Sequence, residues 1–153
     1  MAVSSFEPAD AGFADRVRAS FERQGALKTM NVTLTAVEPG RTVMELPWSQ
    51  EVTQQHGFVH AGVLGAVMDT ACGYAAFSLM PADAAVLTVE YKVNLLAPAR
   101  GQLFRIQGEV LKPGRTITVS EGRAWALDGG KEKLVATMTC TLMAVFGREG
   151  VQH

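Results

Sequence analysis

A single carboxylate, Asp69, lies in an almost uncharged run from Gln54 to Tyr74, with the sequence QQHGFVHAGVLGAVMDTACGY. A carboxylate in apolar surroundings costs free energy unless it is paired or has a chemical role, so Asp69 is a candidate catalytic group. Two histidines and three glycines precede it, and this pattern predicts a tight turn that leads into a helix with exposed first amides. Such amides hold a developing negative charge, as in attack on a carbonyl group.

The amides of Ala61 and Gly62 are the candidate donors at the start of this helix. Asp69 lies eight residues beyond Ala61, so at 1.5 Å rise per residue the two are about 12 Å apart along one helix. One small carbonyl group cannot touch both. A second copy of the chain, with antiparallel helices across a two-fold axis, would bring each helix start beside the other Asp69. The sequence therefore predicts an obligate dimer with two shared sites.

The helix predicted over residues 62–79 separates its two sides by side-chain size. Bulky residues that would pack on a sheet lie away from Asp69 on a helical wheel: Val63, Leu64, Val67, Met68 and Tyr74. Small residues lie within about 60° of Asp69: Gly62, Gly65, Ala66, Gly73 and Ala76. Such a face lets another backbone approach or leaves room for a ligand, and both fit an interface site. The alternative for Asp69 is a structural carboxylate that pairs within that interface.

The elements around this helix follow from hydrophobic periodicity. An amphipathic helix is predicted over about residues 8–24. Six strands are predicted over residues 30–37, 42–46, 85–96, 103–111, 116–127 and 133–146. Strict alternation from Thr88 to Asn94 indicates a sheet with one covered and one wet face. The economical architecture is α+β, with a curved antiparallel sheet wrapped around the central helix.

Composition limits the classes of partner. The chain has 153 residues, which fits a single domain over 1–153 with its core at about 28–146. Its net charge of -1 and its 19% charged residues give no reason to expect a nucleic-acid partner. No run approaches the roughly 20 apolar residues that cross a bilayer, so no membrane partner and a cytoplasmic location are expected. Cys72 and Cys140 are predicted to be free buried thiols without a metal, and His153 to be disordered.

The pattern resembles the hotdog-fold acyl-CoA thioesterases, in particular the phenylacetate-pathway type, which carries His-Gly-Gly and then an acidic residue on the central helix. The matching residues are Gln54, Gly57, His60, Gly62 and Asp69. The resemblance runs from about Val43 to Val145 and includes the strand over 88–96, the segment 97–101 and the later Gly114-Arg115-Thr116. It implies a hotdog fold with an N-terminal helix, and dimers that usually pair into homotetramers.

The resemblance also implies residue roles. Asp69 would act as nucleophile or general base, and the Ala61 amide would polarise the thioester carbonyl. Gln54 would orient that carbonyl, His60 would position the helix start, and Thr88 would help to hold the attacking water. Substrate-binding positions would be Gly62, Gly57, Asn94, Arg115 and Thr116.

Two positions depart from the family pattern. The first glycine of the usual pair is Ala61, whose amide still donates while its methyl group narrows the site. Gly73 occupies a position where some relatives carry a hydroxyl group, so Thr88 is left to fill that role. Neither departure removes the acid.

The implied function is hydrolysis of an aryl- or medium-chain acyl-CoA to the free acid and coenzyme A. No cofactor is expected, because coenzyme A is part of the substrate and thiolate is a good leaving group. The basic residues available for its phosphates are Arg100, Arg115 and Lys92 or Lys112. Two alternatives stay open: a hotdog hydratase-dehydratase in which His60 and Asp69 converge on an enoyl or hydroxyacyl thioester, and a non-catalytic acyl-CoA-binding protein.

Overall fold

Six strands form one antiparallel sheet in a computed structural model that describes residues 6–153. The strands are β1 (Thr33–Glu38), β2 (Arg41–Pro47), β3 (Ala84–Leu95), β4 (Leu103–Lys112), β5 (Ile117–Asp128) and β6 (Lys131–Phe146). The helices are α1 (Phe13–Phe21), α2 (Gly25–Thr29), the short η1 (Gln50–Val52) and the long α3 (Ala61–Phe77). None of the helices in the described range is long and apolar enough to cross a membrane.

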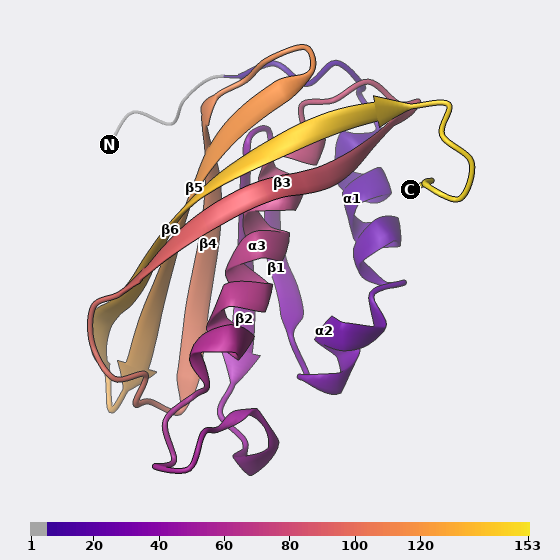
Figure 1. Ribbon diagram of the computed structural model, residues 1–153. Coiled ribbons are helices and arrows are strands. Elements are labelled where there is room, and N and C mark those ends of the chain that lie inside the picture. The colour runs from indigo at the N-terminus through magenta and orange to yellow at the C-terminus, as the bar shows by residue number, and fades with distance from the viewer. Residues whose placement is uncertain (1–5) are drawn as a thin grey trace.

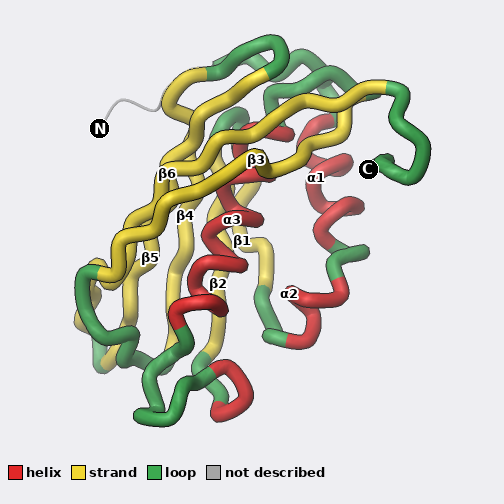
Figure 2. Tube along the Cα trace, in the orientation of Figure 1, coloured by secondary structure: helices red, strands yellow, loops and turns green. Residues whose placement is uncertain are grey.

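The sheet curves around α3, and α1 and α2 lie beside that helix (Figure 1). The strand order is β1-β2-β4-β5-β6-β3, so β3 forms one edge of the sheet (Figure 2). Side chains alternate along β4 between the core, which takes Phe104 and Ile106, and the outer face. The prediction of an α+β architecture with a curved antiparallel sheet around a central helix is confirmed.

The N-terminal region differs from its prediction. The pattern over residues 8–24 predicts one helix, but the chain forms α1 and then the separate α2. The break lies at Gln24, which is extended with a ψ of 98°, and at Gly25, whose backbone freedom opposes helix continuation. Arg16 fixes α1 beyond the end of α3, because its guanidinium donates to the carbonyls of Met80 (2.7 Å) and Pro81 (2.8 Å).

The bulky side of α3 lies in or against the core, but Tyr74 packs there against a helix and not against the sheet. Three of its predicted sheet-facing residues are fully buried: Leu64, Val67 and Met68. Tyr74, which the helical wheel assigns to the sheet, packs edge-on against Phe21 of α1, with ring centroids 6.5 Å apart. Its hydroxyl bonds with Ser20 Oγ (2.9 Å) and accepts from Gln24 Nε2 (2.8 Å). A buried phenol needs such polar partners, and α1 together with the residue that caps α2 supplies them.

The small-residue side of α3 is only partly open in the described chain. Gly62 is exposed and Ala66 is half-buried. Gly65, Gly73 and Ala76 are buried, contrary to the open face that the wheel suggests; the hydroxyl of Tyr91 lies over Gly65, and Leu142 of β6 packs over Gly73. The open stripe of α3 consists of Gly62, Ala66, Asp69 and Thr70.

Gly108 of β4 lets the middle of α3 approach the sheet. A methyl group at this position would overlap the carbonyl group of Ala71. That same carbonyl accepts a hydrogen bond of 2.8 Å from Thr42 Oγ1 of β2, in a fully buried position. The distance between helix and sheet is therefore fixed at the level of Ala71, two residues beyond Asp69.

We expect the substitution Gly108→Ala to destabilise the fold by about 1–3 kcal/mol or more, because the added carbon overpacks a backbone contact that cannot move aside. Gly25→Ala is the matched control, since nothing lies within 4 Å of its ideal Cβ and alanine favours the helix. Thermal and urea unfolding of the two variants measure the difference. Equal stability of both variants would contradict the close approach.

The edge strand β3 is exposed on most of its length. Val89 is 55%, Tyr91 45% and Leu95 55% exposed, although all three are large apolar or aromatic side chains. One backbone edge of β3 pairs with β6, and its other edge has no neighbouring strand in the described chain. A long exposed edge with apolar side chains is a site where strands from other chains add.

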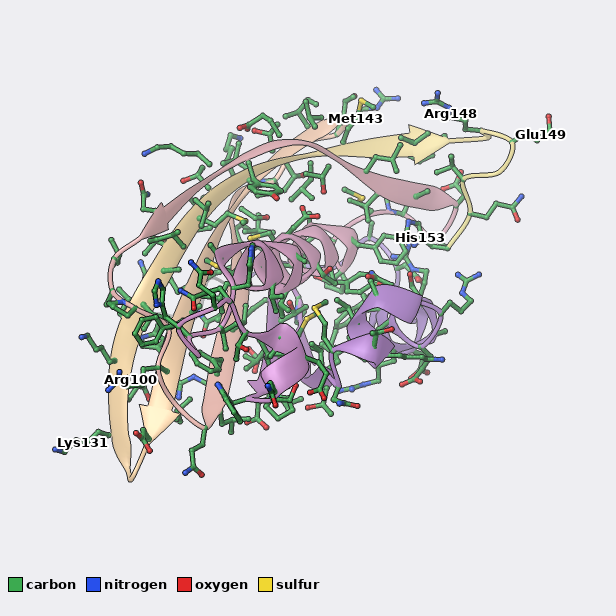
Figure 3. The ribbon with its side chains drawn as sticks, turned by 60° about the horizontal axis from the view of Figure 1, so that its bottom comes forward. Arg100, Lys131, Met143, Arg148, Glu149 and His153 are labelled. Carbon is green, nitrogen blue, oxygen red and sulfur yellow. The ribbon has the colours of Figure 1, made fainter. Side chains whose placement is uncertain are left out.

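His153 is packed in the structure, so the prediction that it is disordered is wrong. Its Nδ1 lies 2.7 Å from Ser20 Oγ, and its ring lies 4.6 Å from the ring of Phe77. Figure 3 shows the final segment turning back so that His153 lies near α1. Burial lowers the pKa of the His153 imidazole, which favours its neutral form in this position.

Candidate active site

Asp69 lies on α3, half-buried, beneath the edge of the sheet formed by β3 and β6. Thr88 Oγ1 of β3 donates to Asp69 Oδ1 at 2.8 Å. Cys140 Sγ of β6 lies 3.8 Å from the same oxygen, within reach of a weak thiol donor. Both hydrogen bonds therefore go to Oδ1, and Oδ2 receives none from the described residues.

The start of α3 is capped by its own histidine. His60 is the N-cap residue, and its Nδ1 accepts the amide of Gly62 at 2.8 Å, so the neutral ring carries its proton on Nε2. The carbonyl of His60 accepts the amides of Val63 (3.0 Å) and Leu64 (3.2 Å). The remaining amide of the first turn, that of Ala61, has no acceptor within residues 6–153.

This cap changes the list of candidate donors. The sequence predicts the amides of Ala61 and Gly62 as partners for a developing negative charge. The ring of His60 already engages the amide of Gly62. Ala61, which is exposed and is the first residue of α3, provides the free amide at the positive end of the helix dipole.

A turn over residues 54–57 places Gln54 close to the helix start. The amide of Gly57 donates to the carbonyl of Gln54 at 3.0 Å, and Gly57 has a φ of 81°, which glycine adopts without strain. Trp48 Nε1 holds the turn from outside through the carbonyl of Gly57 (3.1 Å). The side-chain oxygen of Gln54 accepts the amide of His56, and its NH2 group makes no hydrogen bond within the described residues.

A cavity of about 400 Å³ opens beside the Ala61 amide. Its lining is mostly apolar: Phe58, Val59, Ala61, Leu64, Leu95, Leu96, Ala97, Pro98 and Ala99, with Gln54 as the polar member. The guanidinium carbon of Arg100, which is labelled in Figure 3, lies 5.2 Å from the centroid of the Phe58 ring. An apolar volume next to a free amide suits an acyl group whose carbonyl points to the helix start.

The helix α3 and the strand β3 are antiparallel, and they approach each other at three positions along their length. Asp69 meets Thr88, and an ideal Cβ on Gly65 would lie 3.7 Å from the hydroxyl of Tyr91. Ala61 shares the apolar cavity with Leu95. The eight-residue step from Ala61 to Asp69 is about 12 Å along the helix, so a single chain does not bring the free amide to the carboxylate.

Three predicted substrate-binding residues lie away from both groups. Asn94 accepts from Lys92 Nζ at 2.9 Å, and both side chains lie on the face of β3 opposite Tyr91 and α3. Arg115 lines a separate cavity of about 370 Å³ near the end of α3. Thr116 lies in the turn before β5, where its carbonyl accepts the amide of Ala144. Their roles in substrate binding stay predictions.

Sequence reasoning did not identify Cys140 as a neighbour of Asp69. The alternation of β6 places Cys140 on the core side, and it is fully buried, as is Cys72 of α3. The hydrogen bond to Cys140, burial and the nearby charge of Asp69 raise the pKa of the Cys72 thiol, so that it keeps its proton. The rotation of α3 against β6 decides that Cys140 faces Asp69, and no pattern in either segment alone reports that rotation.

Comparison with known proteins relates the chain to one family. The family model described as "Thioesterase superfamily" matches residues 56–133, about half of the chain and the part that contains α3, β3, β4 and β5. A thioesterase family protein from Silicibacter pomeroyi has a similar solved structure, with 52% identity, a TM-score of 0.88 and coverage of 89% of this chain and 100% of that chain.

Two further proteins are similar at lower identity. The 1,4-dihydroxy-2-naphthoyl-CoA hydrolase of Listeria monocytogenes is 26% identical over 77% of this chain and 94% of its own length. The solved structure of the E. coli PaaI protein from the phenylacetic acid degradation operon is 18% identical, with a TM-score of 0.79 and coverage of 91% of this chain and 97% of that chain. This last likeness shows a shared fold.

Proposed function

Since the chain belongs to the thioesterase superfamily and has its hotdog fold, we propose that it hydrolyses an aryl- or medium-chain acyl-CoA at a site shared by two subunits. It is a hydrolase of the thioesterase family. The named activity of the Listeria relative on an aromatic acyl-CoA supports an aryl substrate. The proposal rests mainly on two groups without a hydrogen-bond partner in the described residues, the Ala61 amide and Asp69 Oδ2. Ala61 and Asp69 lie four residues before and four residues after Gly65 on α3.

A two-fold axis at the level of Gly65 and Tyr91 would bring the two groups together. Gly65 lies midway between Ala61 and Asp69, so the axis exchanges their levels and sets each free amide beside the partner's carboxylate. The open stripe of α3 carries small side chains where the two antiparallel helices would approach each other. The site is thus complete in a homodimer and incomplete in one chain.

The exposed edge of β3 supports the same axis. Antiparallel pairing of two β3 strands centred near Tyr91 would bring the Thr88 end of one strand beside the Leu95 end of the other. Leu95 lines the apolar cavity of its own chain, and Thr88 holds the carboxylate of its own chain. The pairing would cover the exposed side chains of Val89 and Tyr91 and continue the sheet across both subunits. A homotetramer built from two such dimers stays part of the proposal.

In the proposed mechanism the thioester carbonyl lies at the start of α3, with the acyl group in the apolar cavity. The Ala61 amide stabilises the negative charge that develops on the carbonyl oxygen. Gln54 donates its NH2 group to the same carbonyl or to the thioester sulfur. The Asp69 carboxylate of the other subunit either attacks the carbonyl carbon or takes a proton from the attacking water. The C–S bond then breaks, and coenzyme A leaves as thiolate. In the general-base route this step releases the free acid directly; in the nucleophilic route it leaves a mixed anhydride on Asp69, which water hydrolyses to the free acid and the regenerated carboxylate.

The hydrogen bond from Thr88 to Asp69 can be tested by substitution. Thr88→Val removes the donor to Oδ1 at nearly constant volume, so we expect kcat to fall about 10- to 100-fold, the usual loss for a hydrogen bond to a charged group. Thr88→Ser keeps the donor and should stay within a few-fold of the parent. Steady-state release of coenzyme A measures both. Equal rates for the valine and serine variants would remove Thr88 from the mechanism.

The function itself is tested by a panel of aromatic, short-, medium- and long-chain acyl-CoAs, with free thiol as the readout. Release of thiol from aryl- or medium-chain substrates is the expected result. Hydration of crotonyl-type thioesters without thiol release would favour a hydratase instead. The structure supports a hydratase less well, because His60 Nδ1 accepts the amide of Gly62 in the helix cap. Binding of the panel without turnover would indicate a binding protein.

A further inference from the structure

The carboxylate of Asp69 is held from two different strands. Thr88 approaches from the edge strand β3, and Cys140 approaches from its neighbour β6, where it pairs with Tyr91 in the ladder. Thr88 is exposed in the single chain, whereas Cys140 is fully buried. The buried side of the carboxylate thus rests on a thiol, and the exposed side on a hydroxyl.

We propose that Cys140 is a positioning residue for the proposed hydrolysis, which holds Asp69 Oδ1 together with Thr88 so that Oδ2 is the reacting oxygen. The inference rests on the proposed function of Asp69. It adds a residue from β6, outside the segment from Gln54 to Thr88 that carries the groups of the proposed mechanism. Cys140 does not touch the substrate in this account and acts through the carboxylate.

The geometry supports a fixed orientation. A carboxylate with one donor turns about its terminal torsion, which is broad for aspartate, and can exchange its two oxygens. Donors on two sides of Oδ1 oppose that exchange because rotation breaks both hydrogen bonds. Oδ2 receives no hydrogen bond from the described residues and is the oxygen left for the thioester carbon or for water.

Two polar side chains, Cys72 and Ser120, neighbour Cys140. The neighbouring Cys140 and burial raise the pKa of the Cys72 thiol, so Cys72 keeps its proton. Cys72 makes no hydrogen bond with Asp69. Ser120 lies opposite Cys140 in the ladder between β5 and β6, and its buried hydroxyl bonds to none of the described residues. Ser120 therefore offers a matched control beside the same position.

The kinetic experiment compares Cys140→Ala, Cys140→Ser and Ser120→Ala in the full chain. We expect Cys140→Ala to lower kcat about three- to tenfold with little change in KM, since a weak donor is lost and the substrate contacts stay. Cys140→Ser should restore kcat to within about twofold, because a hydroxyl donates to the same oxygen. Ser120→Ala removes one buried atom nearby and should leave kcat unchanged.

A spectroscopic experiment tests the contact without any substrate. In a Cys72→Ala background, Cys140 is the remaining cysteine of the two in the sequence, so its S–H stretching band in the infrared is assigned directly. Replacing Asp69 with Asn in this background weakens the acceptor, and the band should move to higher frequency. Ser120→Ala in the same background should leave the band in place.

The two readouts separate the inference from the proposed function. If no acyl-CoA is cleaved but the S–H band responds to Asp69→Asn, the proposed function fails and the Cys140 contact stands. The positioning role is overturned if thioesters are cleaved, Cys140→Ala keeps the parent kcat, and the S–H band of Cys140 does not shift in Asp69→Asn. A loss of kcat that serine does not rescue would show a packing effect and also overturn it.

Discussion

Asp69→Asn should abolish thioester hydrolysis, with kcat lower by about 100- to 10,000-fold and the fold intact. The range is that expected for loss of a group that transfers a proton in the transition state, and loss of a nucleophile costs no less. The amide keeps the size of the carboxylate and an oxygen for the donor hydrogen bond from Thr88, so packing around α3 is preserved. Stopped-time release of coenzyme A from the best aryl substrate measures the loss.

Asp128→Asn is the matched control for this substitution. Asp128 ends β5 in an exposed position at the turn to β6 and is not among the candidate site residues, so its substitution should leave kcat unchanged. If Asp69→Asn keeps the thermal stability and the oligomeric state of the parent, the loss of activity is a loss of chemistry. Full activity of Asp69→Asn would make the carboxylate a structural group and remove the basis of the proposed mechanism.

Ala61→Pro is the second large expected effect, because it deletes the free amide and leaves the helix in place. Ala61 is the first residue of α3, a position where proline is favoured, and His60 before it is already extended with a ψ of 136°. Removal of one oxyanion donor typically costs about 100- to 1,000-fold in kcat. Circular dichroism checks the helix, and thiol release measures the rate. Ala61→Ser, which keeps the amide, should retain most of the activity.

Mixing these two inactive variants tests whether the site is shared. Random exchange of equal amounts gives about half heterodimers, and each heterodimer has one site with an intact carboxylate and an intact amide. About a quarter of the parent activity should therefore return. No recovery, in a mixture shown by mass spectrometry to contain heterodimers, would place both groups in one chain or remove one of them from the mechanism.

The sequence predicts the central helix, the sheet around it and the separation between Ala61 and Asp69 because each depends on local periodicity. An eight-residue step on a helix is a fixed length, whatever the rest of the chain does. The same periodicity fails at Tyr74 and Gly73. Both lie where α1 and β6 cover the second half of α3, and that cover depends on segments far away in the chain.

Cys140 and His60 show the same limit within the candidate site. Strand alternation places Cys140 in the core, but its contact with Asp69 depends on the angle between β6 and α3. The resemblance assigns His60 to positioning the helix start, and the structure specifies the means, a ring nitrogen that accepts the Gly62 amide. Such a cap requires the extended backbone of His60, which the residue type alone does not determine.

The cap formed by His60 also bears on chemical selectivity among carbonyl compounds. With the Gly62 amide occupied, the helix start offers one backbone donor to the carbonyl oxygen. Thioesters need less help than oxygen esters or amides, since sulfur donates little electron density to the carbonyl group and leaves readily as an anion. A single backbone donor therefore favours thioesters over oxygen esters and peptide bonds. On the proposed mechanism, the His60 ring therefore contributes to selectivity for thioesters over oxygen esters and amides.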